Sequence, residues 1–461
     1  MDILIIGGGP GGYVAAIRGA QLGANVTLIE KKYIGGTCLN VGCVPTKVLL
    51  NTVDLYDTLI RDGSTLGLEH NGLSVNWLKL QERKKNIVSN LVGGVEKLLE
   101  ANKVKVLRGT GKLIGKHTAE VTLVDGNVEA VSFDKAILAT GSKATIVPIP
   151  GIEKENILTS DEILSLEKLP ESLCIVGGGV IGSEFASVFS RLGVDVTIVE
   201  MLPRIVATMD QSLTDFLDYS LKESGVDIKT ETKVVKFDGS DDYVTIHVES
   251  SEGRRVINAE KVLLSIGRRP MVKNLGLETL GIKEEHGIVI NERMETSVED
   301  IYAIGDCTGG VMLAHVASAQ GIAAVENIMH MKTKMDFKTI PYCVYAKPEL
   351  ASVGMTEDEA KEKNIDYKIG TFPLSSSGKA MILNETEGLV KFIVDKNTEE
   401  ILGLHMVGPK ATELIVEGAL ALRLEATVDE IVTTIHAHPT VSEAIQEAAH
   451  DVFNQGIHLM Y

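Results

Sequence analysis

Two cysteines near the amino terminus are placed to carry out thiol chemistry. Cys38 and Cys43 lie in the segment GGTCLNVGCVPTKVLL, and Pro45 follows two residues after the second cysteine. Proline is common in the first turn of a helix, and the residues that follow have a helical pattern. We therefore expect Cys43 at the amino terminus of a helix, where the positive end of the helix dipole lowers the pKa of a thiol and stabilises its thiolate.

Two other interpretations of this cysteine pair are a buried pair of free thiols and half of a zinc site. A structural zinc ion would need two more ligands at compact spacing. The other cysteines, Cys174, Cys307 and Cys343, are scattered, and each lies in an apolar, strand-like segment typical of packing. We therefore expect no metal site, and five cysteines, an odd number, do not suit a disulfide scaffold.

A second group of reactive side chains lies near the carboxyl terminus. His436 and His438 occur in HAHPTVSE, where Pro439 is expected to open a helix. Its apolar face would contain Val441, Ile445, Ala448 and Val452. Imidazole titrates near neutral pH, so a histidine beside Glu443 suits proton transfer. Thr440 and Glu443 also match a capping box, in which case Glu443 only satisfies backbone donors and the histidines are ordinary surface residues.

The elements expected to position these groups come from an internal duplication. Residues 3–30 match residues 173–200 without a gap, at an offset of 170 residues. Each copy reads as a short apolar strand, a glycine turn, a helix and a second strand that ends in an acid, which is the order of a βαβ nucleotide-binding unit. Two copies predict two bound nucleotides.

The glycine spacing is the same in both copies. Each copy contains GxGxxG, whose glycines allow a tight turn, close approach of a pyrophosphate and contact between helix and strand. A single GxGxxG is weak evidence, because glycine turns also occur where a chain merely reverses. The glycines are Gly7, Gly9 and Gly12 in the first copy, and Gly177, Gly179 and Gly182 in the second.

An acidic residue ends the second strand of each copy. Glu30 and Glu200 each lie 23 residues after the first glycine, where a carboxylate can accept a hydrogen bond from a ribose 2′-OH. A carboxylate repels the 2′-phosphate of NADP, so Glu200 favours NAD. Arg204 lies close enough in sequence to weaken this preference.

These motifs resemble those of the flavin-dependent pyridine nucleotide–disulfide oxidoreductases, and the resemblance covers essentially the whole chain. Its most specific parts are the cysteine segment and the histidine segment taken together. The resemblance is carried by GGGPGG (7–12), GGTCLNVGCVPTK (35–47), ATG (139–141), GGGVIGSE (177–184), GRRP (267–270), IYAIGDC (301–307), MLAHVASAQG (312–321) and HAHPTVSE (436–443).

The resemblance implies that Cys38 and Cys43 form a redox-active disulfide, with Cys38 the more exposed sulfur and Cys43 against the flavin. It places Lys47 near flavin N5, paired with Glu184, and makes His438 the catalytic base, oriented by Glu443, with His436 secondary. From composition alone, Lys47 and Glu184 would be solvated helix residues and Asp306 would only cap a strand. The implied FAD-binding residues are Gly7, Gly9, Pro10, Gly12, Glu30, Lys47, Gly141, Asp306 and Ala314, and those for NAD are Gly177, Gly179, Gly182, Glu200 and Gly267.

The expected fold is α/β, with two Rossmann-like dinucleotide-binding domains and a C-terminal α+β dimerisation domain. We expect a FAD-binding domain in two parts (1–146 and 271–338), an NAD-binding domain (147–270) and an interface domain (339–461). His438 lies almost 400 residues after Cys43. The family completes this site in a homodimer, where one subunit lends its histidine to the disulfide of the other.

The implied reaction oxidises dihydrolipoamide carried by a lipoyl protein of a 2-oxo acid dehydrogenase or glycine cleavage system, with reduction of NAD. Glutathione reductase relatives carry basic residues where this chain has Glu200, and mercuric and larger thioredoxin reductases add a C-terminal cysteine pair that is absent here. Two residues depart from the lipoamide-oxidising pattern, Val316 in place of lysine and Met271 in place of asparagine. A related disulfide reductase is therefore an alternative.

Composition excludes other classes of protein. The chain has 461 residues, with 45 Lys and Arg against 63 Asp and Glu and a net charge of −18, so nucleic acid is an unfavourable partner. No apolar run reaches the roughly 18 residues of a membrane helix, and no signal peptide fits before Gly7, so we expect a cytoplasmic protein. A different hypothesis is a mainly structural, flavin-bound dimer that docks on a larger assembly through its acidic surface.

Overall fold

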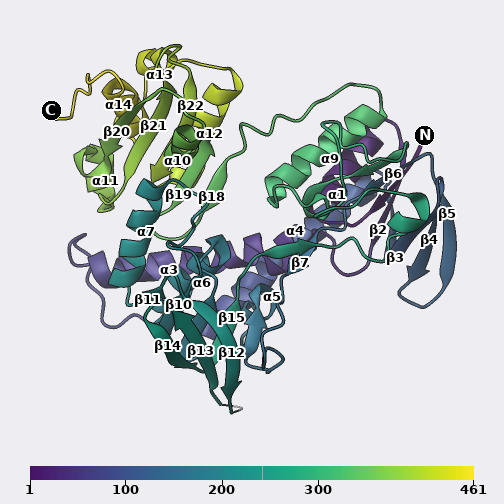
Figure 1. Ribbon diagram of the computed structural model, residues 1–461, viewed down its shortest axis with the longest axis horizontal. Coiled ribbons are helices and arrows are strands. Elements are labelled where there is room, and N and C mark those ends of the chain that lie inside the picture. Colours follow the sequence, from purple (N-terminus) through teal and green to yellow (C-terminus); the bar gives the residue numbers. More distant parts are fainter. Residues whose placement is uncertain (241, 461) are drawn as a thin grey trace.

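The computed structural model describes residues 1–240 and 242–460, whose helices and strands form three units (Figure 1). The first unit, on the right of Figure 1, has a sheet of seven strands in the order β17-β6-β1-β2-β3-β4-β5. The strands from β17 to β3 are parallel, and β4 and β5 continue the sheet as antiparallel neighbours. The strands are β1 (Asp2–Ile6), β2 (Asn25–Glu30), β3 (Lys105–Gly115), β4 (Thr118–Leu123), β5 (Val128–Ser132), β6 (Lys135–Leu138) and β17 (Ile301–Ala303).

Helices from distant parts of the sequence cover this first sheet. The first glycine turn leads into α1 (Pro10–Gln21), which packs along α9 (Ala314–Ile328). The chain thus returns to the first sheet after residue 300, because β17 pairs with β6. The remaining helices of this part are α4 (Trp77–Ala101), α8 (Leu277–Leu280) and the short 3₁₀ helix η1 (Gly305–Thr308).

The second unit repeats the nucleotide-binding pattern around a parallel sheet in the order β11-β10-β9-β15-β8. A three-stranded antiparallel sheet, β12-β13-β14, lies beside it, and the pair β7–β16 is antiparallel. The strands are β7 (Ser142–Ala144), β8 (Ile157–Thr159), β9 (Ser172–Val176), β10 (Asp195–Val199), β11 (Asp227–Lys229), β12 (Lys233–Gly239), β13 (Val244–Ser250), β14 (Gly253–Ala259), β15 (Lys261–Leu264) and β16 (Arg268–Pro270). The helices are α5 (Ser160–Ile163), α6 (Val180–Arg191) and α7 (Gln211–Glu223).

The third unit is an antiparallel sheet with helices, in the order β18-β19-β22-β21-β20. Its strands are β18 (Tyr342–Val344), β19 (Leu350–Gly354), β20 (Tyr367–Pro373), β21 (Leu389–Asp395) and β22 (Ile401–Val407). Its helices are α10 (Glu357–Glu362), α11 (Gly378–Leu383), α12 (Ala411–Arg423), α13 (Val428–Thr433), α14 (Glu443–Asp451) and the 3₁₀ helix η2 (Leu374–Ser376). The expected α/β class, with two Rossmann-like units and a C-terminal α+β unit, is confirmed.

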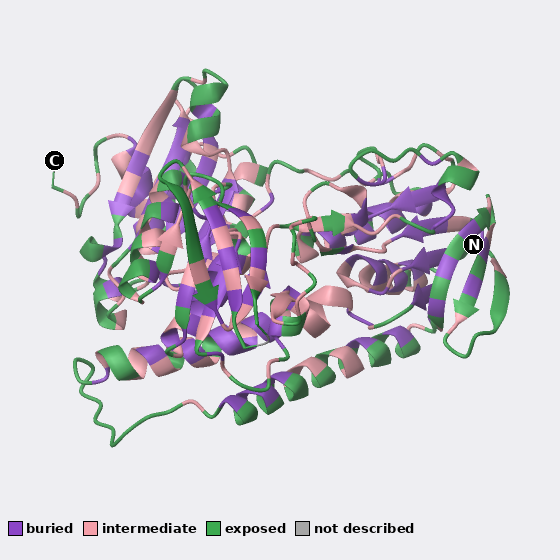
Figure 2. Cartoon of the chain, turned by 60° about the horizontal axis from the view of Figure 1, so that its bottom comes forward, coloured by how far each residue is buried: buried purple, intermediate pink, exposed green. Residues whose placement is uncertain are grey.

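The helix that begins at Cys43 is held by more than one unit. After the short α2 (Gly36–Val41), α3 (Cys43–Asp62) buries Val48 and Leu49 in a core that also contains Phe185 and Phe189 of α6. Figure 2 shows strands that are largely buried, and exposed residues along the outer faces of the long helices. Packing of α3 against α6, the helix that follows the second glycine turn, thus positions the cysteine-bearing helix relative to that turn.

One expected helix begins later than predicted. The sequence placed its start at Pro439, but α14 begins at Glu443. Residues 439–442 instead form a turn in which the Glu443 carboxylate accepts from the Thr440 N–H at 2.8 Å. The predicted apolar face is correct, since Val441, Ile445, Ala448 and Val452 are all buried.

Candidate active site

The two glycine turns have the same geometry, and each of their three glycines has a separate role. Gly7 and Gly177 have φ of +111° and +103°, which favours glycine. A Cβ on Gly12 or Gly182 would lie 1.8 or 2.0 Å from the carbonyl oxygen of the first glycine, so the helix can approach only without a side chain. The middle glycines are open, with no atom within 4 Å of a Cβ built on Gly179. This is the face that a pyrophosphate would approach.

The two acidic residues at the strand ends face these turns. Glu30 Oε2 accepts from the Gly8 N–H and Glu200 Oε2 from the Gly178 N–H, both at 2.7 Å. The Oε1 atom of Glu30 also accepts from the N–H groups of Lys32 and Tyr33, and that of Glu200 accepts from the Leu202 N–H. A carboxylate can accept about four hydrogen bonds, so each still has capacity for a ribose hydroxyl. The turns and their acids therefore fit two dinucleotides.

Cys38 and Cys43 are in contact at the start of α3. A hydrogen bond between their sulfurs is the largest influence on both: it raises the pKa of Cys38, while the Cys43 sulfur accepts it and its pKa falls to about 7. Partial desolvation of the Cys43 sulfur by surrounding protein atoms opposes the fall of its pKa, and the positive charge of Lys47 assists the fall. Of the two sulfurs, Cys43 is the stable thiolate.

The exposure of the two cysteines differs from the expected order. Cys43 is exposed in the single chain and Cys38 is half-buried, although Cys38 was expected to be the more exposed. The reason is that Cys38 lies within α2, which packs against α3, whereas Cys43 is the first residue of α3 and lies at an open helix end.

Lys47 and Glu184 meet across the boundary between α3 and α6. Lys47 Nζ donates to both carboxylate oxygens of Glu184 at 2.8 Å. The Glu184 side chain is 4% exposed, so it is not a solvated helix residue. Tyr345, after β18, adds two contacts: its N–H donates to Glu184 Oε1 at 3.1 Å, and its ring lies 4.5 Å from Lys47 Nζ. Three units of the fold thus converge on one ammonium group, one turn after Cys43.

Asp306 belongs to a polar chain that links β7, β16 and η1. Ser142 Oγ donates to Asp306 Oδ2 at 2.5 Å, and Arg268 Nε donates to Ser142 Oγ at 2.7 Å. Asp306 lies in η1 and does more than cap a strand. Gly141 and Gly267, which precede Ser142 and Arg268 in the sequence, have positive φ and open space at their Cα atoms. Ala314 is the first residue of α9.

His438 lies in the segment of the third unit between α13 and α14, two helices that are labelled in Figure 1. Its side chain is 80% exposed, and its Nδ1 lies 2.8 Å from Glu443 Oε1. Glu443 therefore binds the histidine with one oxygen and the backbone N–H of Thr440 with the other, so both roles considered from the sequence occur together. His436 is different, because its ring is 4% exposed and pairs with Glu417 at 2.9 Å.

The structure does not bring His438 to the cysteines. Within the described residues, no hydrogen bond or ion pair joins His438 or Glu443 to Cys38 or Cys43. Cys174 and Cys307 are buried, and burial raises their pKa to about 12 and about 11. Across residues 1–240 and 242–460, no group of three or more His, Cys, Asp or Glu is arranged to hold a metal ion.

Comparison with known proteins assigns the chain to a family. The family model for pyridine nucleotide-disulphide oxidoreductases matches residues 1–321, and the model for their dimerisation domain matches residues 340–449. The chain belongs to the pyridine nucleotide-disulphide oxidoreductases.

Individual relatives cover nearly the whole chain. The dihydrolipoyl dehydrogenase of Bacillus subtilis is 42% identical, with 99% of each chain aligned. The mitochondrial dihydrolipoyl dehydrogenase of Pisum sativum is 41% identical, covering 99% of this chain and 92% of the relative. The solved structure of LpdA from Mycobacterium tuberculosis has a TM-score of 0.91 at 29% identity, covering 98% of this chain and 99% of that one.

FAD and NAD are the cofactors of pyridine nucleotide-disulphide oxidoreductases of this kind. The two open glycine turns with their acids fit these dinucleotides, as described above.

Sequence reasoning missed Tyr345, since its contacts with Lys47 and Glu184 join residues 161 or more positions apart. A tyrosine in a short strand-like segment gives no signal of such contacts.

Proposed function

We propose that this chain oxidises protein-bound dihydrolipoamide to lipoamide and reduces NAD⁺ to NADH. The observation that carries the reaction type is the Cys38–Cys43 pair beside Lys47, at the start of a helix that packs against the helix following the second glycine turn. Full-length identity of 42% to a dihydrolipoyl dehydrogenase supports the substrate. The proposed balance is dihydrolipoamide + NAD⁺ → lipoamide + NADH + H⁺.

The domain assignment follows the two turns. We assign FAD to the first sheet. Its pyrophosphate and ribose would be bound by Gly7, Gly9, Pro10, Gly12 and Glu30, and other parts of FAD would be bound by Asp306, Gly141 and Ala314. We assign NAD to the second sheet, with Gly177, Gly179, Gly182, Glu200 and Gly267. When bound, the two groups carry the electron pair from the cysteine dithiol to the nicotinamide.

The thiol chemistry uses the difference between the two sulfurs. A substrate thiolate that attacks the disulfide at Cys38 breaks the S–S bond and expels Cys43. A sulfur of low pKa leaves faster, and the positive charge of Lys47, which lowers the pKa of Cys43, stabilises the departing Cys43 thiolate once Cys38 is bonded to the substrate and has no proton to donate. The second substrate thiol then displaces Cys38, which closes the lipoamide disulfide and leaves both cysteines reduced.

His438 is the proposed base for the substrate thiols. Its Nδ1 is occupied by Glu443, so Nε2 is the nitrogen available to take a proton. Glu443 holds the ring through this bond, and its own position is fixed by the Thr440 N–H. The carboxylate stabilises the imidazolium that forms.

A homodimer would complete the site. Val416 and Leu420 on the outer face of α12 and Leu424, the residue that caps its carboxyl end, are 66%, 59% and 70% exposed and lie about one helical turn apart. An apolar stripe of this kind is typical of a contact between copies, and it belongs to the segment matched by the dimerisation-domain model. We propose that His438 of one chain acts at the cysteine site of its partner. We also propose that the protein works in the cytoplasm.

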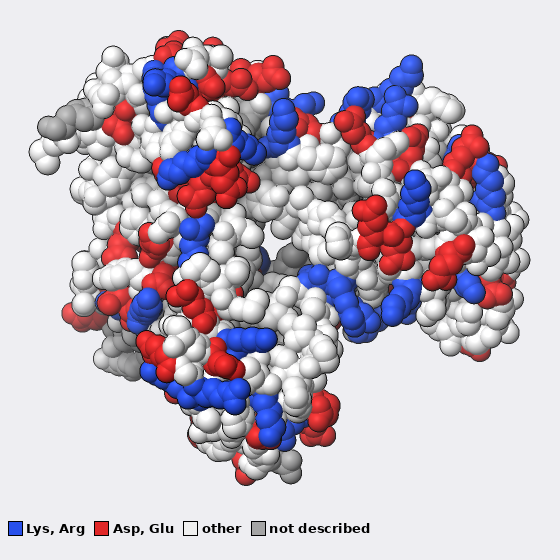
Figure 3. Space-filling model, in the orientation of Figure 1, with Lys and Arg blue, Asp and Glu red and all other residues white. Residues whose placement is uncertain are grey.

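An acidic docking surface finds less support. On the face shown in Figure 3, acidic and basic side chains are interspersed over all three units.

Within the described residues, no helix is long and apolar enough to cross a membrane. The lipoyl-carrying protein of a 2-oxo acid dehydrogenase or glycine cleavage system is the proposed partner as a substrate carrier.

Turnover of the purified protein tests the proposal. We expect NADH formation from dihydrolipoamide and NAD⁺, and a loss of about a thousandfold or more in Cys43→Ser, because the serine cannot form the disulfide. Flavin absorbance of the variant serves as the folding control. Faster reduction of glutathione disulfide by NADPH than oxidation of dihydrolipoamide by NAD⁺ would contradict the proposal.

A further inference from the structure

The loop after β10 borders the second glycine turn. Glu200 begins this loop and accepts from the Gly178 N–H at 2.7 Å, while the Val206 N–H donates to the Gly178 carbonyl at 2.9 Å. Ile205 packs so closely on the same glycine that a Cβ there would lie 2.7 Å from its side chain. Glu200 and the residues next to Arg204 therefore flank one glycine, and Arg204 extends from the same rim of the turn as the ribose-facing carboxylate.

Arg204 nevertheless points to the third unit. Its Nη2 lies 3.3 Å from Asp358 Oδ2 and 3.4 Å from the carbonyl oxygens of Ala207 and Met209. Its Nη1 lies 3.4 Å from Gln211 Oε1. Asp358 supplies the negative charge among these partners, so it provides the strongest attraction that holds the guanidinium away from the turn.

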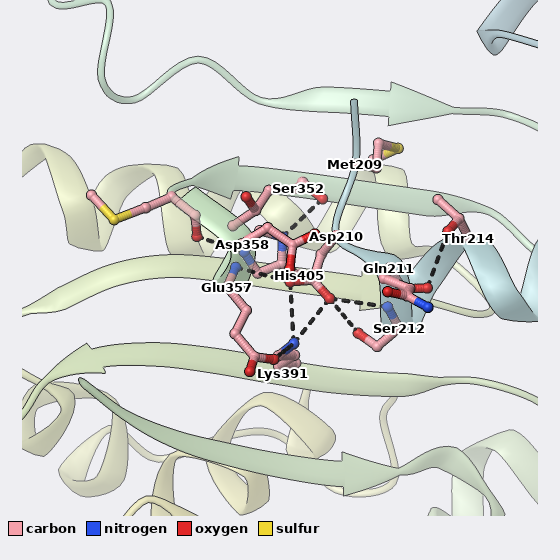
Figure 4. A network of polar contacts seen from close by, with 12 residues as sticks. Met209, Asp210, Gln211, Ser212, Thr214, Ser352, Glu357, Asp358, Lys391 and His405 are labelled. Atoms are coloured by element: carbon pink, nitrogen blue, oxygen red, sulfur yellow. Dashed lines mark hydrogen bonds and ion pairs between the residues drawn. The ribbon is translucent and has the colours of Figure 1, made fainter. Parts of the chain in front are cut away.

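Glu357, the residue before Asp358, belongs to a largely buried ion cluster, which we define as Asp210, Glu357 and Lys391 (Figure 4). Lys391 Nζ donates to both oxygens of Asp210 at 3.0 and 3.1 Å and to Glu357 Oε2 at 2.7 Å. The Glu357 N–H also donates to Asp210 Oδ2 at 3.1 Å. The side chains of Lys391 and Asp210 are only 6% and 2% exposed. The first turn of α10, which carries Asp358, is thus fixed against the end of the nucleotide-site loop.

We infer that Asp358 is a specificity-determining residue that keeps Arg204 from the 2′-position of the nucleotide and so preserves the preference for NAD over NADP. A 2′-phosphate requires a cation, and arginine is the side chain best suited to bind it. Without the Asp358 charge, the partners of Arg204 among residues 1–240 and 242–460 are neutral oxygens, so the guanidinium becomes available to a 2′-phosphate. This inference rests on the proposed binding of NAD at the second turn.

The test uses the holoprotein and two probes without a nicotinamide, 2′,5′-ADP and 5′-AMP, which differ only in the 2′-phosphate. Calorimetric titration of Asp358→Asn should show 2′,5′-ADP bound about three- to fivefold more tightly than by the wild type, the scale of one exposed ion pair. Binding of 5′-AMP should stay unchanged, which also reports an intact site.

Two further variants separate this effect from a general change in charge. Glu362→Gln removes an exposed carboxylate at the other end of α10 and should leave both affinities unchanged. In Asp358→Asn combined with Arg204→Gln, the gain should disappear. An unchanged affinity in Asp358→Asn, or a gain that persists without Arg204, would overturn the inference. Failure of the proposed function would appear separately, as absence of dihydrolipoamide turnover by the wild type.

Discussion

At the scale of single residues, the thiol chemistry depends on charges placed around one sulfur. The Cys38 thiol donates to the Cys43 sulfur, and Lys47 lies on the next turn of the same helix. Glu184 acts in the opposite direction, since its negative charge raises the pKa of Cys43. Lys47 and Glu184 therefore form a pair whose two members should shift the same thiol in opposite senses.

The pH dependence of alkylation of the reduced protein tests this arrangement. A thiol reacts as its thiolate, so modification of Cys43 by iodoacetamide should rise with pH through a midpoint near 7. Lys47→Gln should move the midpoint to higher pH, because it removes a positive charge and leaves Glu184 unpaired. Glu184→Gln should move it to lower pH. The modified cysteine is identified by peptide mass spectrometry, and a midpoint unaffected by Lys47→Gln would contradict the assignment.

At the scale of secondary-structure elements, the ion cluster of Asp210, Glu357 and Lys391 joins the amino ends of α7 and α10. Asp210 is also the N-cap of α7, where it accepts from the Ser212 N–H at 3.1 Å. Burial alone would raise the pKa of Glu357, but hydrogen bonds from Lys361 and Lys391 outweigh it and lower the pKa to about 2. The cluster thus fixes the second unit against the third.

Lys391→Met should destabilise the protein by about 3–5 kcal/mol, because it leaves a buried carboxylate without a counter-charge. Lys391→Met combined with Asp210→Asn should be less destabilised than the single variant, since asparagine also caps helices and carries no charge. Denaturant midpoints of the holoprotein measure both effects. Equal midpoints for Lys391→Met and the wild type would exclude this role of the cluster.

The same cluster predicts a loss of stability in acid. Glu357 has a depressed pKa in the folded chain, so its contribution is complete above the ordinary glutamate value of about 4.3 and is lost as the pH falls toward 2. Glu357→Gln should therefore reduce stability at neutral pH and flatten this part of the stability curve. Denaturant midpoints of wild type and variant between neutral and acidic pH give the comparison.

At the scale of the whole molecule, the proposed site is divided between two chains. The cysteines lie at the junction of the first and second units, and His438 lies on the exposed side of the third. The exposed stripe of Val416, Leu420 and Leu424 lies in the same unit as His438. Association through this unit would cover the stripe and bring the histidine to a partner.

Mixed dimers test the division directly. Cys43→Ser and His438→Gln homodimers should each be nearly inactive. After subunit exchange at equal amounts, about one quarter of wild-type activity should return, because half the dimers are mixed and each mixed dimer has one intact site. If Cys43 and His438 instead acted within one chain, no mixture would recover activity.

The sequence by itself determined the βαβ units, their glycine turns and the cysteine-bearing helix, because these depend on local spacing and on residue types that few other structures require. It also indicated the Lys47–Glu184 pair and the His438–Glu443 pair through motif resemblance. The start of α14 could not be predicted, since a proline suits a helix start but the chain first turns so that Glu443 can bind Thr440.

Only the tertiary structure decided which distant residues meet. Three contacts join different units across more than 150 residues: Tyr345 with Lys47, Asp358 with Arg204, and Lys391 with Asp210. No periodicity or spacing encodes such pairs, because they arise from packing of whole units and from the cost of leaving a buried charge without a partner. Arg204 was ambiguous for this reason: its place in the sequence is beside the nucleotide turn, and its counter-ion is in the C-terminal unit.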